Sequence, residues 1–506
     1  MANKQQTECV IRLLRLTLFM VVIGVGHASS SLAADAPNSA EHDKAMKAVA
    51  PVTLNQTASG YRGIWYHIGS TKDEFKYKYS GGLGTYCDSH YPQAVYCPQV
   101  RKTFFCYGGA PEDDSRRLLH LVSYYDHETG MVPQPTFLLD KQTNDAHDNP
   151  VISVDGDGHI WIFSTSHGRS RPSYVHRSKR PHDIAEFEFV PASRMVKSTR
   201  IPFDNFSYVQ AFYEPSVGFT NFFTRYRDPA KRTTFVTTSA DGIRWTEAVR
   251  LAAIEEGQYQ VGAVGHGKIA TYFNMHPKAK GVDWRTNVYY MESTDHGKTW
   301  QAADGTPLEV PLTSANNPAL VHDYQAEGLL VYLKDLCFDT GGNPVIAYLT
   351  SKGHAPGPAN DPRTLRVFRW TGKEWIDAPI ASTDHNYDSL SLYLDDDQLW
   401  RAIAPTEPGP QPFGTGGEMM LWTSSDHGEH WTKERQLTSN SQFNHSYARR
   451  PINAHPDFYA LWADGNARAP SKSSLYFCNQ AGDVYRLPRT MTDSTAKPER
   501  VMSAAN

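Results

Sequence analysis

The stretch STDHGKTW, residues 293–300, decides the fold because the chain repeats its pattern twice more. SSDHGEHW at residues 424–431 has the same S-x-D-x-G-x-x-W spacing, and SADGIRW at residues 239–245 is one residue shorter. Asp and Gly are favoured in tight turns, for which their short side chains and backbone freedom suit them. A turn pattern that returns along one chain indicates repeated β-hairpins, each of which needs its neighbours to form a stable core.

Seven other segments each contain two strand-like runs around a turn with Gly, Asp or Pro. These segments begin at Tyr91, His147, Tyr208, Tyr259, Gly328, Tyr387 and Tyr447. The starts lie about sixty residues apart, which is enough chain for one four-stranded blade. No strongly amphipathic helix interrupts them. The sequence therefore predicts an all-β, seven-bladed β-propeller, with two separate β-sandwiches as the alternative.

Composition agrees with a turn-rich β protein. The chain has 506 residues, of which 40% are apolar and 12% aromatic, with 36 Gly and 32 Pro. The formal net charge of −4 is spread over 50 basic and 54 acidic residues. Because this balance provides no basic stripe, we expect no nucleic-acid partner.

The N-terminus carries a predicted export signal. A basic region precedes the apolar run LTLFMVVIGVG, and the small residues of ASSSLAADA follow it. The apolar run is short for a membrane span, so we expect a cleaved signal, a secreted or periplasmic monomer and no membrane contact afterwards. The predicted divisions are a signal at residues 1–33, an N-terminal segment at 34–60, the propeller at 61–490 and a tail at 491–506.

Cysteines are too few for a disulfide scaffold. Beyond the signal the chain has Cys87, Cys97, Cys106, Cys337 and Cys478. One bridge among the first three is compatible with their spacing. The sequence is also compatible with a structural zinc or calcium ion, for which Cys337 with a histidine such as His276 or His354 is a candidate.

The run NDAHDNPVISVDGDGHIWIFSTSHG, residues 144–168, suggests where the chemistry lies. His147 and His167 are equally far from its DGDG turn, so they are predicted cross-strand neighbours at the open end of a hairpin. His159 would lie at the opposite end. Tyr208 with Arg225, and Tyr259 with Tyr272, have the same relation to the turns of the next two hairpins. Three successive blades would then direct these side chains toward one mouth of the propeller.

Such a group suits β-elimination on a uronic acid. Imidazole and phenol groups can move protons, and a guanidinium binds a carboxylate through two parallel hydrogen bonds. A positive charge on the carboxylate stabilises the enolate that forms when a base removes the C5 proton. An acid then protonates the departing O4 oxygen. This chemistry requires no cofactor, and its substrate would be an anionic polysaccharide.

Two levels of family resemblance support this interpretation. The three repeated turns resemble the Asp-box of BNR-repeat, sialidase-like proteins, in which the Asp and Gly shape a turn within a blade. Longer runs resemble the BNR-4 type propeller polysaccharide lyases, and most closely the ulvan lyases. These runs are YKYSGGLGTY, TFFCYGG, the histidine run quoted above, YFNMHP and RTNVYYMESTDHGKTW.

The resemblance implies roles for five residues. His147 and Tyr208 would be the proton-transfer pair. His167 and Arg225 would hold and neutralise the uronate carboxylate, and Tyr272 would line the substrate site. Tyr213 is a rival for Tyr208, and Arg227 is a rival for Arg225, because each lies nearby on the same predicted hairpin.

Two other functions remain open. A sialidase would use the same turns, and TRIP at residues 199–202 is similar to the sialidase Arg-Ile-Pro motif. That motif comes late in this chain, and the arginine triad with a Tyr/Glu pair is not evident. A non-catalytic sugar-binding propeller would keep aromatic platforms but would not need the His/Tyr/Arg set.

Overall fold

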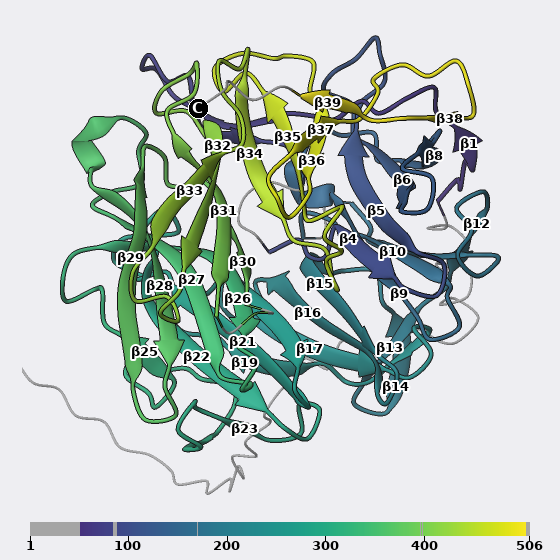
Figure 1. Cartoon of the computed structure of the whole chain (residues 1–506). Coiled ribbons are helices and arrows are strands. Elements are labelled where there is room, and N and C mark those ends of the chain that lie inside the picture. Colours follow the sequence, from purple (N-terminus) through teal and green to yellow (C-terminus); the bar gives the residue numbers. More distant parts are fainter. Residues whose placement is uncertain (1–50, 84–88, 169–170, 395, 397, 502–506) are drawn as a thin grey trace, which may run out of the picture.

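The computed structural model of the chain describes residues 51–83, 89–168, 171–394, 396 and 398–501 (Figure 1). Strands dominate these residues, and their helices are two single 3-10 turns, η1 (Ala146–Asp148) and η2 (Pro358–Asn360). None of the helices in the described part of the chain has the length and apolar character of a membrane span. The predicted all-β class is confirmed.

The sheets are arranged radially around a common centre, which is the architecture of a β-propeller (Figure 1). Sheets 1 to 3 come from the first half of the chain. Sheet 1 contains β4 (Ala94–Cys97), β5 (Lys102–Gly109), β6 (Leu119–Asp126), β8 (Thr136–Asp140) and β1 (Gln56–Thr57). Sheet 2 contains β9 (Pro150–Val154), β10 (Ile160–Ser164), β11 (Tyr174–Ser178) and β12 (Phe187–Val190). Sheet 3 contains β15 (Ser207–Glu214), β16 (Gly218–Tyr226), β17 (Arg232–Ser239) and β19 (Val249–Ala252).

Sheets 4 to 7 follow in chain order. Sheet 4 contains β20 (Gln260–Gly265), β21 (Lys268–Met275), β22 (Thr286–Ser293), β23 (Trp300–Gln301), β24 (Pro307–Leu308) and β25 (Leu320–His322). Sheet 5 contains β26 (Leu330–Phe338), β27 (Pro344–Ser351), β28 (Arg363–Trp370) and β29 (Trp375–Thr383). Sheet 6 contains β30 (Ser391–Tyr393), β31 (Trp400–Glu407), β32 (Glu418–Ser424) and β33 (Thr432–Gln436). Sheet 7 contains β34 (Asn444–Arg449), β35 (Ala460–Gly465), β36 (Leu475–Cys478), β37 (Val484–Arg486) and β39 (Glu499–Val501).

The number of sheets corrects the prediction of seven blades. An eighth sheet of three strands joins β13 (Ser193–Val196), β14 (Thr199–Pro202) and β18 (Arg244–Trp245), so eight sheets have three or more strands. Counting hairpin starts missed this sheet because β13 pairs in parallel with β18, from a later part of the chain. Two small sheets pair β2 (Tyr66–Ser70) with β3 (Tyr77–Gly81), and β7 (Val132–Pro133) with β38 (Thr495–Ala496).

The three repeated turns have similar hydrogen bonds and lie between β17 and β18, between β22 and β23, and between β32 and β33. In the turn between β22 and β23, Asp295 Oδ1 accepts the backbone N–H groups of Lys298 and Thr299 at 3.0 and 2.9 Å. The indole of Trp300, 3% exposed, donates to the carbonyl of Gly297 at 3.2 Å. Trp245 and Trp431 make the equivalent bond to a glycine carbonyl at 3.0 and 3.1 Å. Each turn is thus held at both ends, by a carboxylate and by a tryptophan.

Residues near both ends of the chain close the ring. Tyr61 N–H donates to the Pro488 carbonyl at 2.8 Å, and Ile64 N–H donates to the Gly108 carbonyl at 3.3 Å. This places the segment between sheet 7 and sheet 1. Because β1 belongs to sheet 1 and β39 to sheet 7, the propeller sheets extend beyond the predicted limits of 61–490. The predicted signal at residues 1–33 lies outside the described residues.

None of the cysteines in the described part of the chain forms a disulfide: Cys97, Cys106, Cys337 and Cys478. Cys87 lies outside the described residues. Cys337 Sγ accepts from Arg450 at 3.0 Å, and His276 Nδ1 lies 3.1 Å from the Trp284 carbonyl oxygen.

Candidate active site

The predicted histidine pair forms at the open end of the β9–β10 hairpin. Ile160 pairs with Val154 beside the turn, and Ser164 pairs with Pro150 at the far end. Continued past the last pair, this register brings His147 opposite His167. Their rings stack with centroids 3.9 Å apart and an interplanar angle of 12°. The hairpin symmetry that the sequence suggested is therefore confirmed for this pair.

Asp145 joins the two rings through one carboxylate. His147 Nδ1 lies 2.5 Å from Asp145 Oδ1, and His167 Nδ1 lies 2.9 Å from Asp145 Oδ2. The same carboxylate caps η1 by accepting the His147 backbone N–H at 3.1 Å. Arg171 Nη2 donates to Asp145 Oδ2 at 2.8 Å. Burial alone would raise the pKa of Asp145, but the two histidine hydrogen bonds outweigh it and lower that pKa well below its ordinary value.

The environment of His147 favours a neutral imidazole. Burial lowers its pKa below 6.5, and the charges of His167 and Arg232 lower it further, while Asp145 opposes the shift. Since the ionised Asp145 can only accept, Nδ1 carries the proton and Nε2 holds the lone pair. A histidine in this state can act as a general base at neutral pH.

Tyr208 lies beside this base because of a β-bulge. In sheet 3, Ser207 pairs with Thr224 and Gln210 with Phe222, so the register shifts between them and Tyr208 falls within the bulge. Its φ of 52° is in the left-handed region, which non-glycine residues adopt mainly where surrounding structure imposes it. The bulge directs the Tyr208 ring to His147, with centroids 5.3 Å apart in an edge-to-face arrangement.

Other aromatic side chains surround Tyr208. Tyr226 OH donates to Tyr208 OH at 3.1 Å, and the Tyr259 ring meets Tyr208 edge-to-face at 5.4 Å. The His90 ring also lies near, with its centroid 5.6 Å from that of the Tyr208 ring. Tyr208 is 1% exposed, so its hydroxyl works in surroundings from which most water is excluded.

Three cations lie next to this aromatic group. The Arg232 guanidinium, at the start of β17, lies over the rings of Tyr226 at 5.6 Å and Tyr259 at 5.0 Å. The Arg285 guanidinium also lies 5.0 Å from the centre of the Tyr259 ring. Burial and the Arg285 charge lower the pKa of the Lys78 ammonium to about 8, although Lys78 also pairs with Asp283. Stacked guanidinium groups of this kind are suited to an anionic sugar.

The structure puts Arg225 among aromatic rings of sheet 3. Its guanidinium lies 5.4 Å from the Phe223 ring and 5.2 Å from the Phe235 ring. Arg225 Nη1 is 3.7 Å from Asp228 Oδ2, which is an ion pair within the same sheet edge. Its backbone pairs with Thr233 of β17, and the expected pairing with Tyr208 is not formed because of the bulge.

Tyr272 points toward the neighbouring sheet 5. Val261, and not Tyr259, is its cross-strand partner, because the β20–β21 turn is centred later than predicted. Tyr272 is 0% exposed, donates to the Ala347 carbonyl at 2.5 Å and accepts the Lys334 N–H at 2.6 Å. These contacts give Tyr272 a packing role between sheets 4 and 5.

Asp145 and Arg232 are the site residues that sequence reasoning missed. Asp145 is the first residue of the DAHDNP run, residues 145–150, and its spacing of two residues from His147 could have identified it as a partner. Arg232 lies on the strand after Arg225, so only the fold brings it close to Tyr259.

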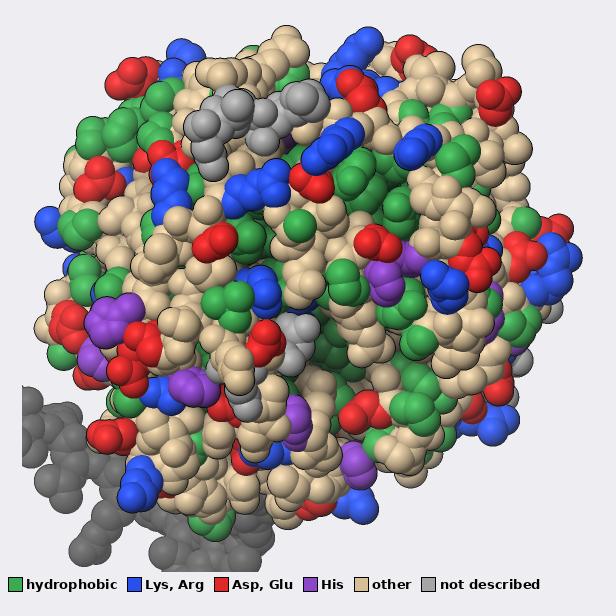
Figure 2. Space-filling model, viewed as in Figure 1, with side chains coloured by type: hydrophobic (Ala, Val, Ile, Leu, Met, Phe, Trp, Pro, Cys, Tyr) green, Lys and Arg blue, Asp and Glu red, His purple; other side chains and the backbone are tan. Residues whose placement is uncertain are grey.

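The opposite ends of the inner hairpins border a separate cavity of about 530 Å³. Its lining includes turn residues such as Gly265, His266 and Asp339 together with Arg450. His159 also lies at the turn end, where its Nδ1 is 2.8 Å from the Ser178 carbonyl oxygen. Figure 2 shows one face of the molecule, on which basic and acidic side chains are interspersed around a hollowed centre. The histidine–tyrosine group is therefore at the other end of the inner strands from this cavity.

Residues 113–383 match BNR_4, a family of BNR repeat-containing proteins. This match covers more than half of the chain, and the protein belongs to that family.

Characterised relatives include two ulvan lyases. The ulvan lyase of Nonlabens ulvanivorans is 24% identical over 470 residues, covering 82% of this chain and 92% of the relative. An ulvan lyase of family PL25 from Pseudoalteromonas sp. (strain PLSV) is 22% identical over 429 residues, covering 76% of this chain and 82% of the relative.

Solved structures agree on the fold. A PL25 ulvan lyase structure has a TM-score of 0.62 at 17% identity and covers 84% of this chain and 96% of its own. A second PL25 structure, bound to -[GlcA(1-4)Rha3S]-, has a TM-score of 0.63 with the same identity and coverage. At 17% identity, the similarity to these structures establishes the fold, whereas the chemistry of the site depends on its own side chains.

Proposed function

We propose that this protein is a polysaccharide lyase that cleaves ulvan, a sulfated polysaccharide containing uronic acid, by β-elimination. The observation that carries the proposal is the neutral His147, whose Nδ1 is fixed on Asp145 and whose ring lies 5.3 Å from that of Tyr208. Such a pair can supply a base and an acid to the same sugar. The ulvan lyase relatives support this choice of reaction and substrate.

His147 Nε2 removes the C5 proton of the uronate, and the electron pair of the broken C–H bond forms an enolate. Positive charge on the carboxylate stabilises that enolate. A guanidinium supplies this charge, and His167 is the second contact of the carboxylate. Arg232 is better placed for this role than Arg225, the residue that the resemblance implies, because its charge acts on His147. Arg225 remains the alternative.

Collapse of the enolate forms the C4–C5 double bond and breaks the bond from C4 to O4. Tyr208 OH gives its proton to the departing O4, so the proton taken by His147 and the one given by Tyr208 balance. No water is consumed. The new non-reducing end is an unsaturated uronate, and the departing fragment keeps O4 as the anomeric hydroxyl of its new reducing end.

The surroundings suit a chain that carries carboxylate and sulfate groups. Arg232, Arg285 and Lys78 provide cations, and Tyr226 and Tyr259 provide aromatic faces. Guanidinium groups pair with planar or tetrahedral oxyanions through directed hydrogen bonds. Tyrosine rings provide flat apolar surface for the C–H faces of a sugar.

The sialidase alternative loses its main support. TRIP forms β14 on the three-stranded sheet, where Arg200 is exposed and donates to Ser193 Oγ at 3.3 Å. An arginine at that outer edge is not part of the His147 group. A purely sugar-binding propeller would not need the Asp145–His147 arrangement that keeps a base neutral.

Variants of the two proton-transfer residues test the proposal. His147→Ala and Tyr208→Phe should each lower the rate of ulvan cleavage at least about a hundredfold, since general acid–base groups contribute about 10²–10⁴-fold. Ultraviolet absorbance of the unsaturated uronate measures the reaction. His159→Ala is the matched control, because His159 lies at the turn end of the same hairpin. Full activity of His147→Ala would eliminate the mechanism.

The same proposal includes three further points. The repeated turns at residues 239–245, 293–300 and 424–431 would be sialidase-like Asp-boxes, supported by their shared carboxylate and tryptophan bonds. The pattern of residues 1–33 supports export to the periplasm or medium. We expect a monomer whose reaction needs no cofactor.

A further inference from the structure

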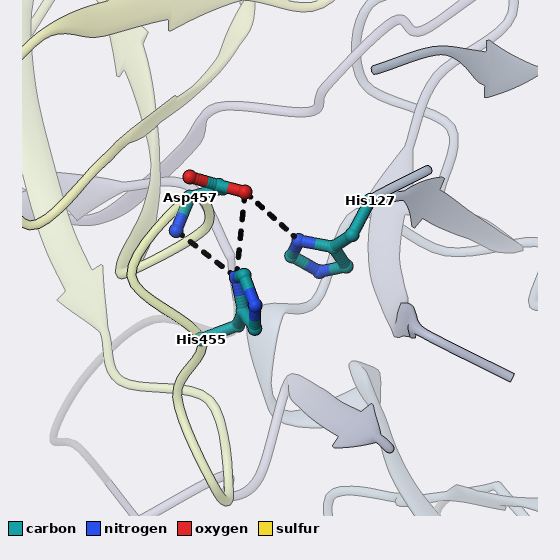
Figure 3. Close-up of side chains that lie close together, drawn as sticks. All are labelled: His127, His455 and Asp457. Atoms are coloured by element: carbon teal, nitrogen blue, oxygen red, sulfur yellow. Dashed lines mark hydrogen bonds and ion pairs between the residues drawn. The ribbon is translucent and has the colours of Figure 1, made fainter. Parts of the chain in front are cut away.

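His127, His455 and Asp457 converge where the first and last sheets meet (Figure 3). His127 directly follows β6 of sheet 1, whereas His455 and Asp457 lie in the loop between β34 and β35 of sheet 7. Tyr96 lies against both rings, with centroids 5.1 Å from His127 and 4.7 Å from His455. The cluster therefore links parts of the chain that become neighbours only when the propeller ring closes.

The spacing of the side chains suits a small cation. His127 Nδ1 and His455 Nδ1 lie 3.7 and 3.6 Å from Asp457 Oδ2. Ligand atoms from all three residues lie within 4.8 Å of one another. Nitrogen and oxygen atoms about 2.0–2.2 Å from a tetrahedral zinc ion are about 3.3–3.6 Å apart. Small side-chain movements would therefore bring these atoms onto one ion.

His127 has a buried ring nitrogen that needs a partner. Its side chain is 0% exposed, and its Nε2 lies 2.8 Å from Thr103 Oγ1. In the described part of the chain, Nδ1 has no hydrogen-bond partner. If Nε2–H donates to Thr103, the Nδ1 lone pair faces the Asp457 carboxylate, and a cation between them would make that contact favourable.

We propose that His127, His455 and Asp457 bind one zinc ion that ties sheet 1 to sheet 7, with water as the fourth ligand. Two imidazoles and a carboxylate form a donor set typical of zinc, while calcium requires six to eight oxygen ligands. Binding would replace the 3.2 Å hydrogen bond from Asp457 N–H to His455 Nδ1. The ion would act on stability, because it joins the two sheets at the ring closure.

Thr103 would be a positioning residue in this site. By accepting from His127 Nε2–H it would fix the tautomer and the ring orientation, and loss of such a partner typically weakens metal binding about 10–100-fold. Thr103→Val keeps the shape of the side chain and removes the hydroxyl, so it should weaken binding without abolishing it.

Metal titration of the full chain tests the proposal. After treatment with a chelator and its removal, the protein is titrated with cobalt(II) chloride, followed by visible absorbance, and with zinc chloride, followed by calorimetry. His455→Ala and Asp457→Asn remove ligands that are partly or largely exposed. His430→Ala is the matched control, because it removes an exposed histidine whose Nδ1 also meets an aspartate, Asp426, at 2.7 Å. His167→Ala tests the other histidine–aspartate group that could bind a metal.

We expect one equivalent of cobalt or zinc to bind to the unsubstituted protein and to His430→Ala and His167→Ala. His455→Ala and Asp457→Asn should weaken binding at least about tenfold. Zinc should raise the unfolding temperature of the unsubstituted protein in a concentration-dependent way, but not that of His455→Ala. Absence of binding to the unsubstituted protein would overturn the proposal. So would binding that persists in His455→Ala and disappears in His167→Ala.

Discussion

Asp145→Asn removes the charge that holds both histidine rings while keeping nearly the same side-chain volume. In the native site, the two carboxylate oxygens face His147 Nδ1 at 2.5 Å and His167 Nδ1 at 2.9 Å. An asparagine has only one oxygen acceptor, so one ring must face an amide N–H. If that ring is His147, it takes the tautomer whose proton is on Nε2 and can no longer remove a proton from the substrate.

The expected loss follows from the lost hydrogen bond. A hydrogen bond to a charged group contributes about 1.5–3 kcal/mol. Because about 1.4 kcal/mol corresponds to a factor of ten in rate, kcat/KM should fall about tenfold to a hundredfold. Initial rates on ulvan, followed by ultraviolet absorbance, measure this change.

The pH profile separates a role in positioning the base from a loss of fold. His147 must be neutral to act, so kcat/KM falls as the pH drops through its pKa, which burial places below 6.5. Asp145 stabilises the charged imidazole, so its removal lowers the pKa of His147 further and moves the acidic limb to lower pH. Asp155→Asn, in the DGDG turn at the other end of the hairpin, should keep the native rate and profile. A native rate in Asp145→Asn would refute the role of this carboxylate.

Three other expectations concern charge, packing and acid stability. Arg232→Ala should lower kcat/KM about a hundredfold or more, because it removes a group that stabilises charge in the transition state. If Arg232→Ala keeps native activity while Arg225→Ala loses both binding and turnover, then Arg225 is the residue that binds the uronate carboxylate. Tyr272→Phe should lower the free energy of unfolding, measured with denaturant, by about 1–3 kcal/mol for each buried group left unsatisfied. Steady-state kinetics should show an unchanged KM. A raised KM would instead support the predicted contact of Tyr272 with the substrate. Burial lowers the pKa of His176 and of His385 from 6.5 to about 3, so the unfolded state binds more protons in this range. The contribution of these two histidines to the free energy of unfolding is then fully present above pH 6.5. It is lost as the pH falls toward 3, by up to about 1.4 kcal/mol per pH unit for each histidine. Urea midpoints that are equal at pH 7.5 and pH 5 would contradict this.

Local patterns predicted the elements whose geometry depends on nearby residues. The DGDG turn and regular β9–β10 register placed His147 opposite His167, because a hairpin without a bulge preserves sequence symmetry. The same reasoning failed at Tyr208, where one bulge shifts the register. It failed again for Tyr272, because the turn lies between Gly265 and Lys268.

Side-chain contacts between different sheets left no local signal in the sequence. Arg232 approaches Tyr259 from another sheet, and His127 meets His455 across the junction of the first and last sheets. The three-stranded sheet escaped prediction for a related reason, since β18 pairs with a strand far earlier in the chain. Sequence periodicity reports which face of a strand is buried but not which distant strand will cover it.

Digestion of ulvan in water enriched in heavy oxygen distinguishes elimination from hydrolysis without any variant. Elimination uses no water, so we predict products that absorb ultraviolet light, carry an unsaturated uronate and contain no heavy oxygen at the cleaved ends. Mass spectrometry of the oligosaccharides reads both features at once. Saturated products with heavy oxygen at each new reducing end would contradict the lyase mechanism.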